Sequence, residues 1–154
     1  MKWQESLDIE ANIETIWRLF GWDQQQRIMP QVVENKLIEE KAGGVGTRVQ
    51  QKYQEGKRIE TYIVEVLEHE DTNEKKHLKI EFELAKMFRI HAVFTLYKLD
   101  ERLTRFEYGG TNEGLNFIGK LMMKLGSSKR NQQVVDDFMN RVRQEALKDE
   151  LQAV

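Results

Sequence analysis

The stretch Gly114–Val154, GLNFIGKLMMKLGSSKRNQQVVDDFMNRVRQEALKDELQAV, has the apolar spacing of a helix, and it follows a long region in which apolar and polar residues alternate as in strands. The chain is therefore predicted to open with a strand and a short helix, to continue as antiparallel strands and to close with one long helix. A curved sheet wrapped against a single helix leaves room for a hollow between them. This order predicts an α+β fold with a binding cavity.

Two apolar stripes divide the closing helix. The first stripe consists of Leu115, Ile118, Met122 and Leu125. The second stripe consists of Val134, Val135, Phe138, Met139, Val142 and Ala146. A straight helix over 115–149 would be about 50 Å long, whereas a ten-residue strand spans roughly 33 Å. We therefore expect a break near Gly126, within Gly126-Ser127-Ser128, and a sheet-covering helix from Lys129 to Lys148.

The region between residues 32 and 111 has a period of two, which is typical of strands with one buried face. The strand candidates are 32–40, 47–54, 59–67, 78–84, 88–96 and 103–111. An opening strand, in which Trp3, Leu7 and Ile9 form the apolar side, makes about seven in total. Mostly short turns join them, so the sheet should be antiparallel. The pair Gly109-Gly110 predicts a bulge or bend in the last strand.

Two short helices are expected before the second strand. Asn12 is a suitable N-cap, and the apolar residues of 13–20 repeat at helical spacing up to Gly21, which ends the helix. Residues 24–29 form a further helical turn that Pro30 stops, because the residue before a proline is excluded from the helical region.

Composition excludes several classes of protein. At 154 residues the chain is expected to form one domain over 1–154, with a sizeable core. The net charge of -2 argues against nucleic-acid binding, and the lack of cysteine excludes disulfide and thiol chemistry. The opening residues lack the apolar segment of a secretory signal, and no apolar run approaches the ~20 residues that cross a bilayer. We expect a cytoplasmic monomer or weak dimer.

The whole chain resembles the helix-grip fold of the START-like (SRPBCC) superfamily, which includes the Bet v 1-type proteins and the polyketide cyclase/dehydrase and lipid-transport group. Three features carry the resemblance: ANIETIW at Ala11–Trp17 after the opening strand, GGVGT at Gly43–Thr47 between two strands, and the terminal amphipathic helix. The resemblance implies a fold rather than one activity, since such proteins bind lipids, quinones and other hydrophobic ligands, cyclise rings or act as co-chaperones.

We therefore expect the chain to bind a small hydrophobic or amphipathic ligand (a lipid, a quinone or a polyketide-like molecule) between the sheet and the Lys129–Lys148 helix, without a cofactor. Apolar burial would drive binding at roughly 25 cal/mol per Å², and a few polar groups would orient the ligand. Strand parity and helical stripes select as wall residues Phe20, Phe82, Phe94, Met122, Phe138, Met139 and Val142. The alternative is a cyclase or dehydratase-type enzyme that uses the same cavity.

An enzyme would need an acid or base inside that cavity, and Glu5 is the first candidate. It shares the apolar side of the opening strand, where a buried carboxylate is costly unless it is paired. The competing interpretation places Glu5 at an edge that solvent still reaches. Glu65 is a weaker candidate on a similar parity argument.

His91 is the third candidate, because a histidine in an apolar cavity can exchange a proton near neutral pH. An outward orientation is favoured, since Ile90, Ala92 and Phe94 are the residues of this strand best suited to the interior.

Neither the other histidines nor the glycine-rich segment predicts a metal or phosphate site. His69 and His77 flank the acidic turn at 71–74 and are expected to be exposed on paired strands; they lack tight ligand spacing, so no metal site is predicted. The Gly43–Thr47 segment lacks the Gly-Lys-Ser/Thr ending of a phosphate-binding loop and has strand pattern on both sides, which favours a hairpin. The family resemblance places this loop near the mouth of the cavity.

The segment 115–130 carries basic residues and no acid inside an acidic protein, and its other face is apolar and contains methionine. Such a helix can lie on an anionic membrane or bind a partner, as in a membrane-docking or co-chaperone-like interaction module. The alternative, which we favour, is that its apolar residues close one end of the cavity while its lysines are solvated.

Overall fold

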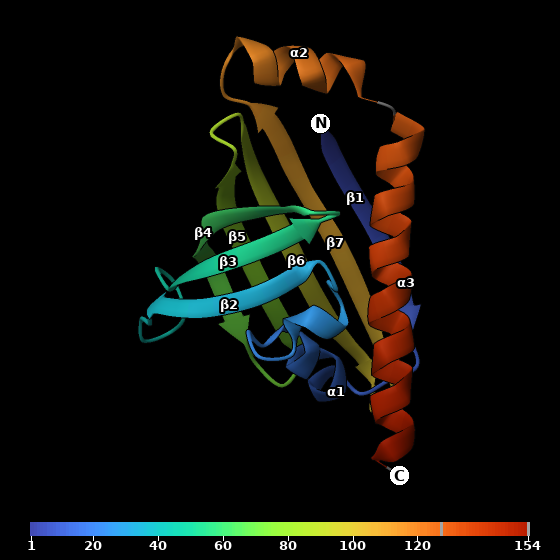
Figure 1. Cartoon of the computed structure of the whole chain (residues 1–154). Helices are drawn as coiled ribbons and strands as arrows, with labels where there is room; N and C mark the ends of the chain where they lie inside the picture. Colours follow the sequence, from blue (N-terminus) through green and yellow to red (C-terminus); the bar gives the residue numbers. More distant parts are fainter. Residues whose placement is uncertain (127, 154) are drawn as a thin grey trace.

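The computed structural model describes residues 1–126 and 128–153, which form one antiparallel sheet with three α-helices and two 3₁₀ turns (Figure 1). The elements are β1 (Lys2–Ile9), α1 (Ile13–Trp17), η1 (Arg18–Phe20), η2 (Gln25–Arg27), β2 (Val32–Glu39), β3 (Arg48–Glu55), β4 (Arg58–Asp71), β5 (Lys75–Leu84), β6 (Phe88–Asp100), β7 (Leu103–Gly114), α2 (Phe117–Leu125) and α3 (Ser128–Gln152). The seven strands lie in the order β1-β7-β6-β5-β4-β3-β2. The predicted architecture is confirmed.

The N-terminal helices begin and end close to the predicted residues. The Asn12 side chain accepts a hydrogen bond from the Glu14 backbone N–H at 2.9 Å and starts α1. The helix is shorter than predicted, because its α-helical part ends at Trp17 and the chain continues to Phe20 as the tighter η1 turn.

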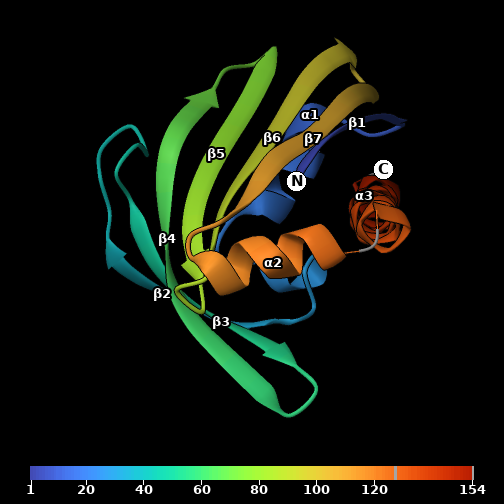
Figure 2. The same cartoon turned by 90° about the horizontal axis from the view of Figure 1, so that it is seen from above.

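The sheet is strongly curved, and α2 lies across the open end of its concave side (Figure 2). The curvature accompanies a partial separation of β4 from β5. These strands pair only from Glu65 opposite Glu81 to Asp71 opposite Lys76, and the earlier half of β4 pairs with β3 alone. A bulge between Val66 and Glu68 shifts the register within the paired part.

Gly109 and Gly110 do not form the predicted bulge. Both pair in unbroken register with β1 and with β6. Their smallness serves packing instead, because a Cβ on Gly110 would lie 2.4 Å from Cζ2 of Trp3. The indole of Trp3 therefore occupies the place that a side chain at this position would need.

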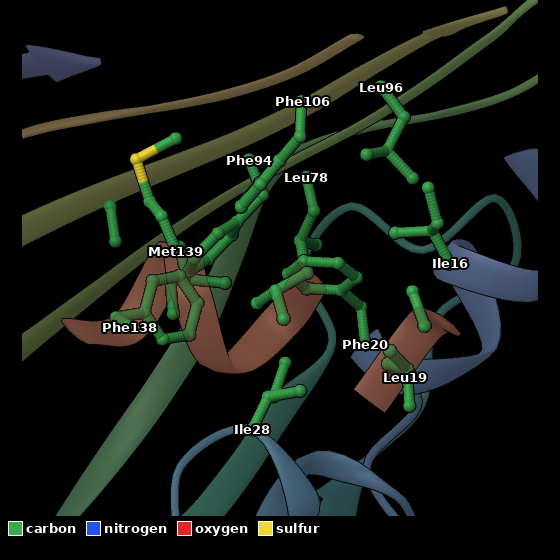
Figure 3. Close-up of a cluster of buried hydrophobic side chains, with 14 of the residues drawn as sticks. Ile16, Leu19, Phe20, Ile28, Leu78, Phe94, Leu96, Phe106, Phe138 and Met139 are labelled. Atoms are coloured by element: carbon green, nitrogen blue, oxygen red, sulfur yellow. The ribbon is translucent and has the colours of Figure 1, made fainter. Parts of the chain in front are cut away.

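The core lies between the concave face of the sheet, α1, η1 and the middle of α3 (Figure 3). Inward residues such as Leu78 on β5, Phe94 on β6 and Phe106 on β7 are at most 6% exposed. Phe20 connects the N-terminal helices to this layer, with its ring centroid 5.2 Å from that of Phe94. Phe138 of α3 contacts the same group, 5.9 Å from Phe94.

The predicted break of the closing helix is confirmed at Gly126, which has φ −66° and ψ 141° and ends α2 in extended conformation. The helix α3 runs past the predicted end at Lys148 because its last turns bind the N-terminal segment. Arg27 contacts Asp149 with two hydrogen bonds of 2.8 and 2.9 Å, and the Asn12 backbone N–H donates to the carboxylate of Glu150.

Candidate functional site

A pocket of about 850 Å³ opens where the N-terminal helices, the glycine-rich loop and the strands β4 and β5 meet. Its lining residues are Trp17, Arg18, Phe20, Gly21, Trp22, Asp23, Leu37, Glu40, Lys41, Ala42, Gly43, Gly44, Thr47, Val66, His69 and Leu78. Phe20, Val66 and Leu78 also belong to the buried core, so the pocket reaches down to the apolar interior. We refer to this feature as the mouth pocket.

One wall of the mouth pocket is aromatic. The indole of Trp17 lies 5.9 Å from the His69 ring and 6.1 Å from the ring of Phe20, measured between centroids. Trp17 is half-buried, and His69 is exposed. A flat ring entering here would therefore meet aromatic faces rather than flexible chains.

His69 reaches this wall because of the bulge in β4. Simple alternation after Val66 would turn His69 outward, but the register shift places it opposite Leu78, an inward residue of β5. His69 is exposed on a strand that pairs with the strand of His77, as expected, but the two side chains lie on opposite faces of the sheet. A bulge re-aims the side chains that follow it, and a period-two pattern does not show the extra residue.

The glycine-rich loop, which is the predicted hairpin between β2 and β3, also lines the pocket. Its backbone is fixed to β4 by hydrogen bonds from the Gly46 N–H to the Val66 carbonyl, 2.8 Å, and from the Val66 N–H to the Thr47 carbonyl, 2.9 Å. Gly44 has φ +88°, and a Cβ there would lie 2.7 Å from Cγ of His69. Glycine thus allows the loop to approach the histidine closely.

A buried polar network lies beside the pocket, behind Trp22. The Gln51 amide nitrogen donates to Gln25 and to Asn35, both at 2.9 Å, and the Tyr62 hydroxyl donates to the Gln51 amide oxygen at 2.6 Å. Asn35 in turn donates to the Trp22 carbonyl at 3.0 Å. Burial raises the pKa of Tyr62 well above its ordinary value, so its hydroxyl remains a donor. The network holds the Trp22 backbone in place.

A buried lysine secures α1 beneath the aromatic wall. Lys76 points inward from β5, is 2% exposed, and binds Asp71 and Glu14, the latter at 2.6 Å. Burial lowers the pKa of Lys76, but the hydrogen bonds to Asp71 and Glu14 outweigh that effect and raise it above its ordinary value. The ion pairs connect α1 to the β4–β5 hairpin, and so they fix Trp17 relative to His69.

Most predicted wall residues lie in the core rather than at the mouth pocket. Phe94, Phe138, Met139 and Val142 are at most 8% exposed and pack in the hydrophobic core. Figure 3 shows the first three of them. Phe20 belongs to the same cluster but also borders the pocket.

The two remaining wall candidates lie elsewhere. Phe82 stacks on Tyr62 with ring centroids 4.7 Å apart, beside a second hollow of about 540 Å³ where β4 and β5 separate. Met122 is half exposed on α2.

The three acid–base candidates are not brought together. Glu5 faces α3, where its carboxylate accepts a hydrogen bond from the Gln132 side chain at 3.2 Å. Glu65 is exposed on the outer face of β4 and borders the second hollow. His91 also lies on the outer face, 3.4 Å from Glu81 and 3.3 Å from Thr111, as the favoured interpretation stated.

No set of three metal-binding side chains occurs in the described residues. His77 contacts Glu68 at 2.8 Å and Thr95 at 2.9 Å, so its ring nitrogens have protein partners. Within residues 1–126 and 128–153, no helix has both the length and the apolar content needed to cross a bilayer.

Comparison with known proteins identifies the fold. No family model matches the sequence, and no curated protein is similar to it. Among solved structures, a START superfamily protein from Mycobacterium smegmatis matches with a TM-score of 0.73 at 11% identity, over 96% of this chain and 97% of that one. The Zhui aromatase/cyclase from a Streptomyces species matches with a TM-score of 0.71 at 13% identity, over 96% and 94%. A conserved protein from Geobacillus kaustophilus gives 0.68 at 16% identity, over 96% of each chain.

Sequence reasoning missed most of the mouth pocket. Trp17 and Trp22 lie on either side of Gly21, the residue that was expected to end the first helix. Two tryptophans so close to a helix end were the one sequence feature that could have indicated an aromatic pocket there. The glycine-rich loop, by contrast, lies at the pocket as the family resemblance implied.

Proposed function

We propose that this chain, which has the START-like helix-grip fold, binds a small amphipathic molecule with a flat apolar part in the mouth pocket. The observation that carries the proposal is the aromatic wall of Trp17 and His69, which lines one pocket together with the glycine-rich loop and with residues of the core. A pocket of about 850 Å³ lies within the range that accommodates cofactor-sized or drug-sized ligands.

The polar groups at the rim suit an amphipathic ligand. Arg18 and Lys41 are cationic, while Asp23 and Glu40 are anionic, so the rim has both signs of charge. Lys41 is also paired with Glu39 at 2.7 Å. A quinone, a polyketide-like ring or a lipid with a compact head group would bury its apolar part against Phe20 and leave its polar part at this rim.

The arrangement supports binding more than cyclase or dehydratase catalysis. None of the three acid–base candidates, Glu5, Glu65 and His91, borders the mouth pocket. A general acid or base must come within hydrogen-bond reach of the proton it transfers. The exposed helix α2, within the 115–130 segment, is the surface that we propose for contact with a membrane or partner.

The experiment is fluorescence titration with anilinonaphthalenesulfonate, an amphipathic aromatic probe, following energy transfer from tryptophan. Leu37 lines the pocket and is 49% exposed, whereas its neighbour Ile38 is 45% exposed and does not line it. Leu37→Glu should weaken the probe's affinity about tenfold, because it removes an apolar contact and adds a carboxylate. Ile38→Glu, with the same charge change, should bind as the parent does.

Equal affinities of the two variants would place the probe elsewhere and contradict the proposal. A second measurement, native mass spectrometry of protein purified from its own cells, would identify the natural ligand. A co-purifying molecule that Leu37→Glu loses and Ile38→Glu retains would support the mouth pocket as its site.

A further inference from the structure

The helix α2 exposes nearly all of its large apolar side chains. The exposed fractions are 80% for Phe117, 59% for Ile118, 46% for Leu121, 50% for Met122 and 78% for Leu125. The favoured expectation, that this stripe closes the cavity by packing, does not describe these residues in the structure. An exposed cluster of this kind is uncommon on a free protein surface and marks an interaction site.

The five apolar residues share one face of the helix. At about 100° per residue, the positions from Phe117 to Met122 span an arc of roughly 140°. Lys120 and Lys124 border this arc on the side of Phe117, within about 60° of it. The helix therefore has a broad apolar face with a row of positive charge along one edge.

The opposite side of α2 is anchored through its backbone. Gly119 is buried, and a Cβ there would lie 2.3 Å from the Met87 carbonyl oxygen at the β5–β6 turn. The Leu115 N–H donates to that same carbonyl at 2.8 Å, and the Asn116 side chain accepts from the Gly119 N–H at 2.7 Å. Glycine contacts and a side-chain cap therefore orient the helix, and its apolar face stays out of the core.

The charge of this region differs from that of the rest of the chain. The net charge is -2, yet residues 115–135 contain four basic residues, Lys120, Lys124, Lys129 and Arg130, and no acid. Lys120 and Lys124 are both exposed. Positive charge beside an apolar face complements a surface that is anionic above and apolar below.

We propose that α2 lies in the head-group region of an anionic lipid bilayer, with its apolar face at the acyl boundary and its lysines against lipid phosphates. The size of the face favours a bilayer over a second copy of the chain. Nine residues make a helix about 13 Å long, and such a face is far smaller than the ~800 Å² per partner that a stable interface buries. A bilayer needs no such matched area. This proposal is independent of ligand binding in the mouth pocket.

The test is co-sedimentation of the full chain with vesicles of phosphatidylcholine alone, or of phosphatidylcholine and phosphatidylglycerol in equal amounts. The chain should bind the anionic vesicles, and salt should weaken that binding. Phe117→Ser with Leu125→Ser, and separately Lys120→Glu with Lys124→Glu, should each reduce partitioning at least about tenfold. The matched controls are Leu151→Ser, at a residue 79% exposed on α3, and Lys36→Glu with Lys57→Glu; both should bind as the parent does.

Three outcomes would overturn the proposal. They are no binding to anionic vesicles, equal binding to both vesicle types, or unchanged binding of the α2 variants. Analytical ultracentrifugation adds a further check, because a dimer that the Phe117→Ser and Leu125→Ser changes dissolve would assign the face to a second copy. All variants should keep the parent's probe affinity at the mouth pocket, so failure here is distinguishable from failure of the proposed function.

Discussion

The helices α2 and α3 follow each other in the chain, and each has an apolar stripe. The stripe of α3 is mostly buried against the sheet, whereas the stripe of α2 is exposed. In α3, the apolar residues facing the sheet are at most 8% exposed. In α2, the corresponding residues are between 46% and 80% exposed. Figure 1 shows α3 running alongside the sheet and α2 lying across its end.

The difference comes from what each helix meets. The C-terminal half of α3 meets the N-terminal segment, where Arg27 binds Glu145 and Asp149. Nearer the middle of the helix, Phe138 contacts Phe94 of the sheet. The helix α2 meets a β-turn through Gly119. An apolar stripe therefore shows that a helix has a face to cover, and only tertiary structure shows what covers it.

The largest expected effect is on stability, in the pair Phe138→Ala and Phe117→Ala. Phe138 is 8% exposed and contacts three aromatic rings, those of Phe94, Phe106 and Tyr108, so its truncation should lower the free energy of unfolding by about 3–5 kcal/mol. Phe117 is 80% exposed, and its truncation should change that quantity by no more than about 0.5 kcal/mol. Urea unfolding followed by circular dichroism measures both. Similar losses in the two variants would mean that α2 is packed in solution.

A smaller effect is expected from Arg27→Gln, which removes the ion pairs that hold the last turns of α3. The Arg27 side chain is 33% exposed and its partners Glu145 and Asp149 are 16% and 27% exposed, so the pairs are only partly screened. The loss in unfolding free energy should be about 1–2 kcal/mol. Arg105→Gln is the control, since Arg105 and Asp8 are both 46% exposed, and it should cost less than about 1 kcal/mol.

The same ion pairs predict a pH dependence. A hydrogen bond from Arg27 lowers the pKa of Asp149 below its ordinary 3.8, and hydrogen bonds from Lys148 and Arg27 lower that of Glu145 below 4.5. Groups with a lowered folded-state pKa add stability above their ordinary values and lose it as the pH falls through the folded values. The stability gap between parent and Arg27→Gln should be constant above about pH 5 and shrink below pH 4. A gap that widens in acid would contradict this assignment.

The fold could be predicted because its signals are local. Alternation along single strands, the Asn12 cap and the interruption at Gly126 each act over a few residues, and all appear in the structure. Phe138 and most of its stripe were correctly placed against the sheet for the same reason, although they form core instead of a cavity wall; Val134, which is 64% exposed, is the exception.

The site could not be predicted to the same depth because its geometry depends on distant contacts. The bulge after Val66 turns His69 inward, and no residue type in the sequence of β4 predicts that bulge. Glu5 was ambiguous from strand parity alone, and the residue that contacts it, Gln132, is 127 positions away. Gly110 was interpreted as a bend, whereas it accommodates the ring of Trp3.

The smallest effect on global stability is expected from Gly119→Ala, which tests how α2 is held. Alanine within a helix is normally about 1 kcal/mol more favourable than glycine. Here the added Cβ would meet the Met87 carbonyl oxygen at 2.3 Å, so α2 must move away from the β5–β6 turn. Because α2 buries little apolar surface, the two effects should leave the unfolding free energy within about 1 kcal/mol of the parent value.

The consequence should instead be local, and amide hydrogen exchange measures it. Exchange in α2 should accelerate in Gly119→Ala while exchange in the C-terminal half of α3 stays unchanged, because separate contacts hold the two helices. Gly126→Ala is the matched control: its Cβ would have no atom nearer than 3.5 Å, so exchange in α2 should not accelerate. Equal acceleration in α2 and α3 would show that the two helices open as one unit, and the contrast between them would then hold only for the resting structure.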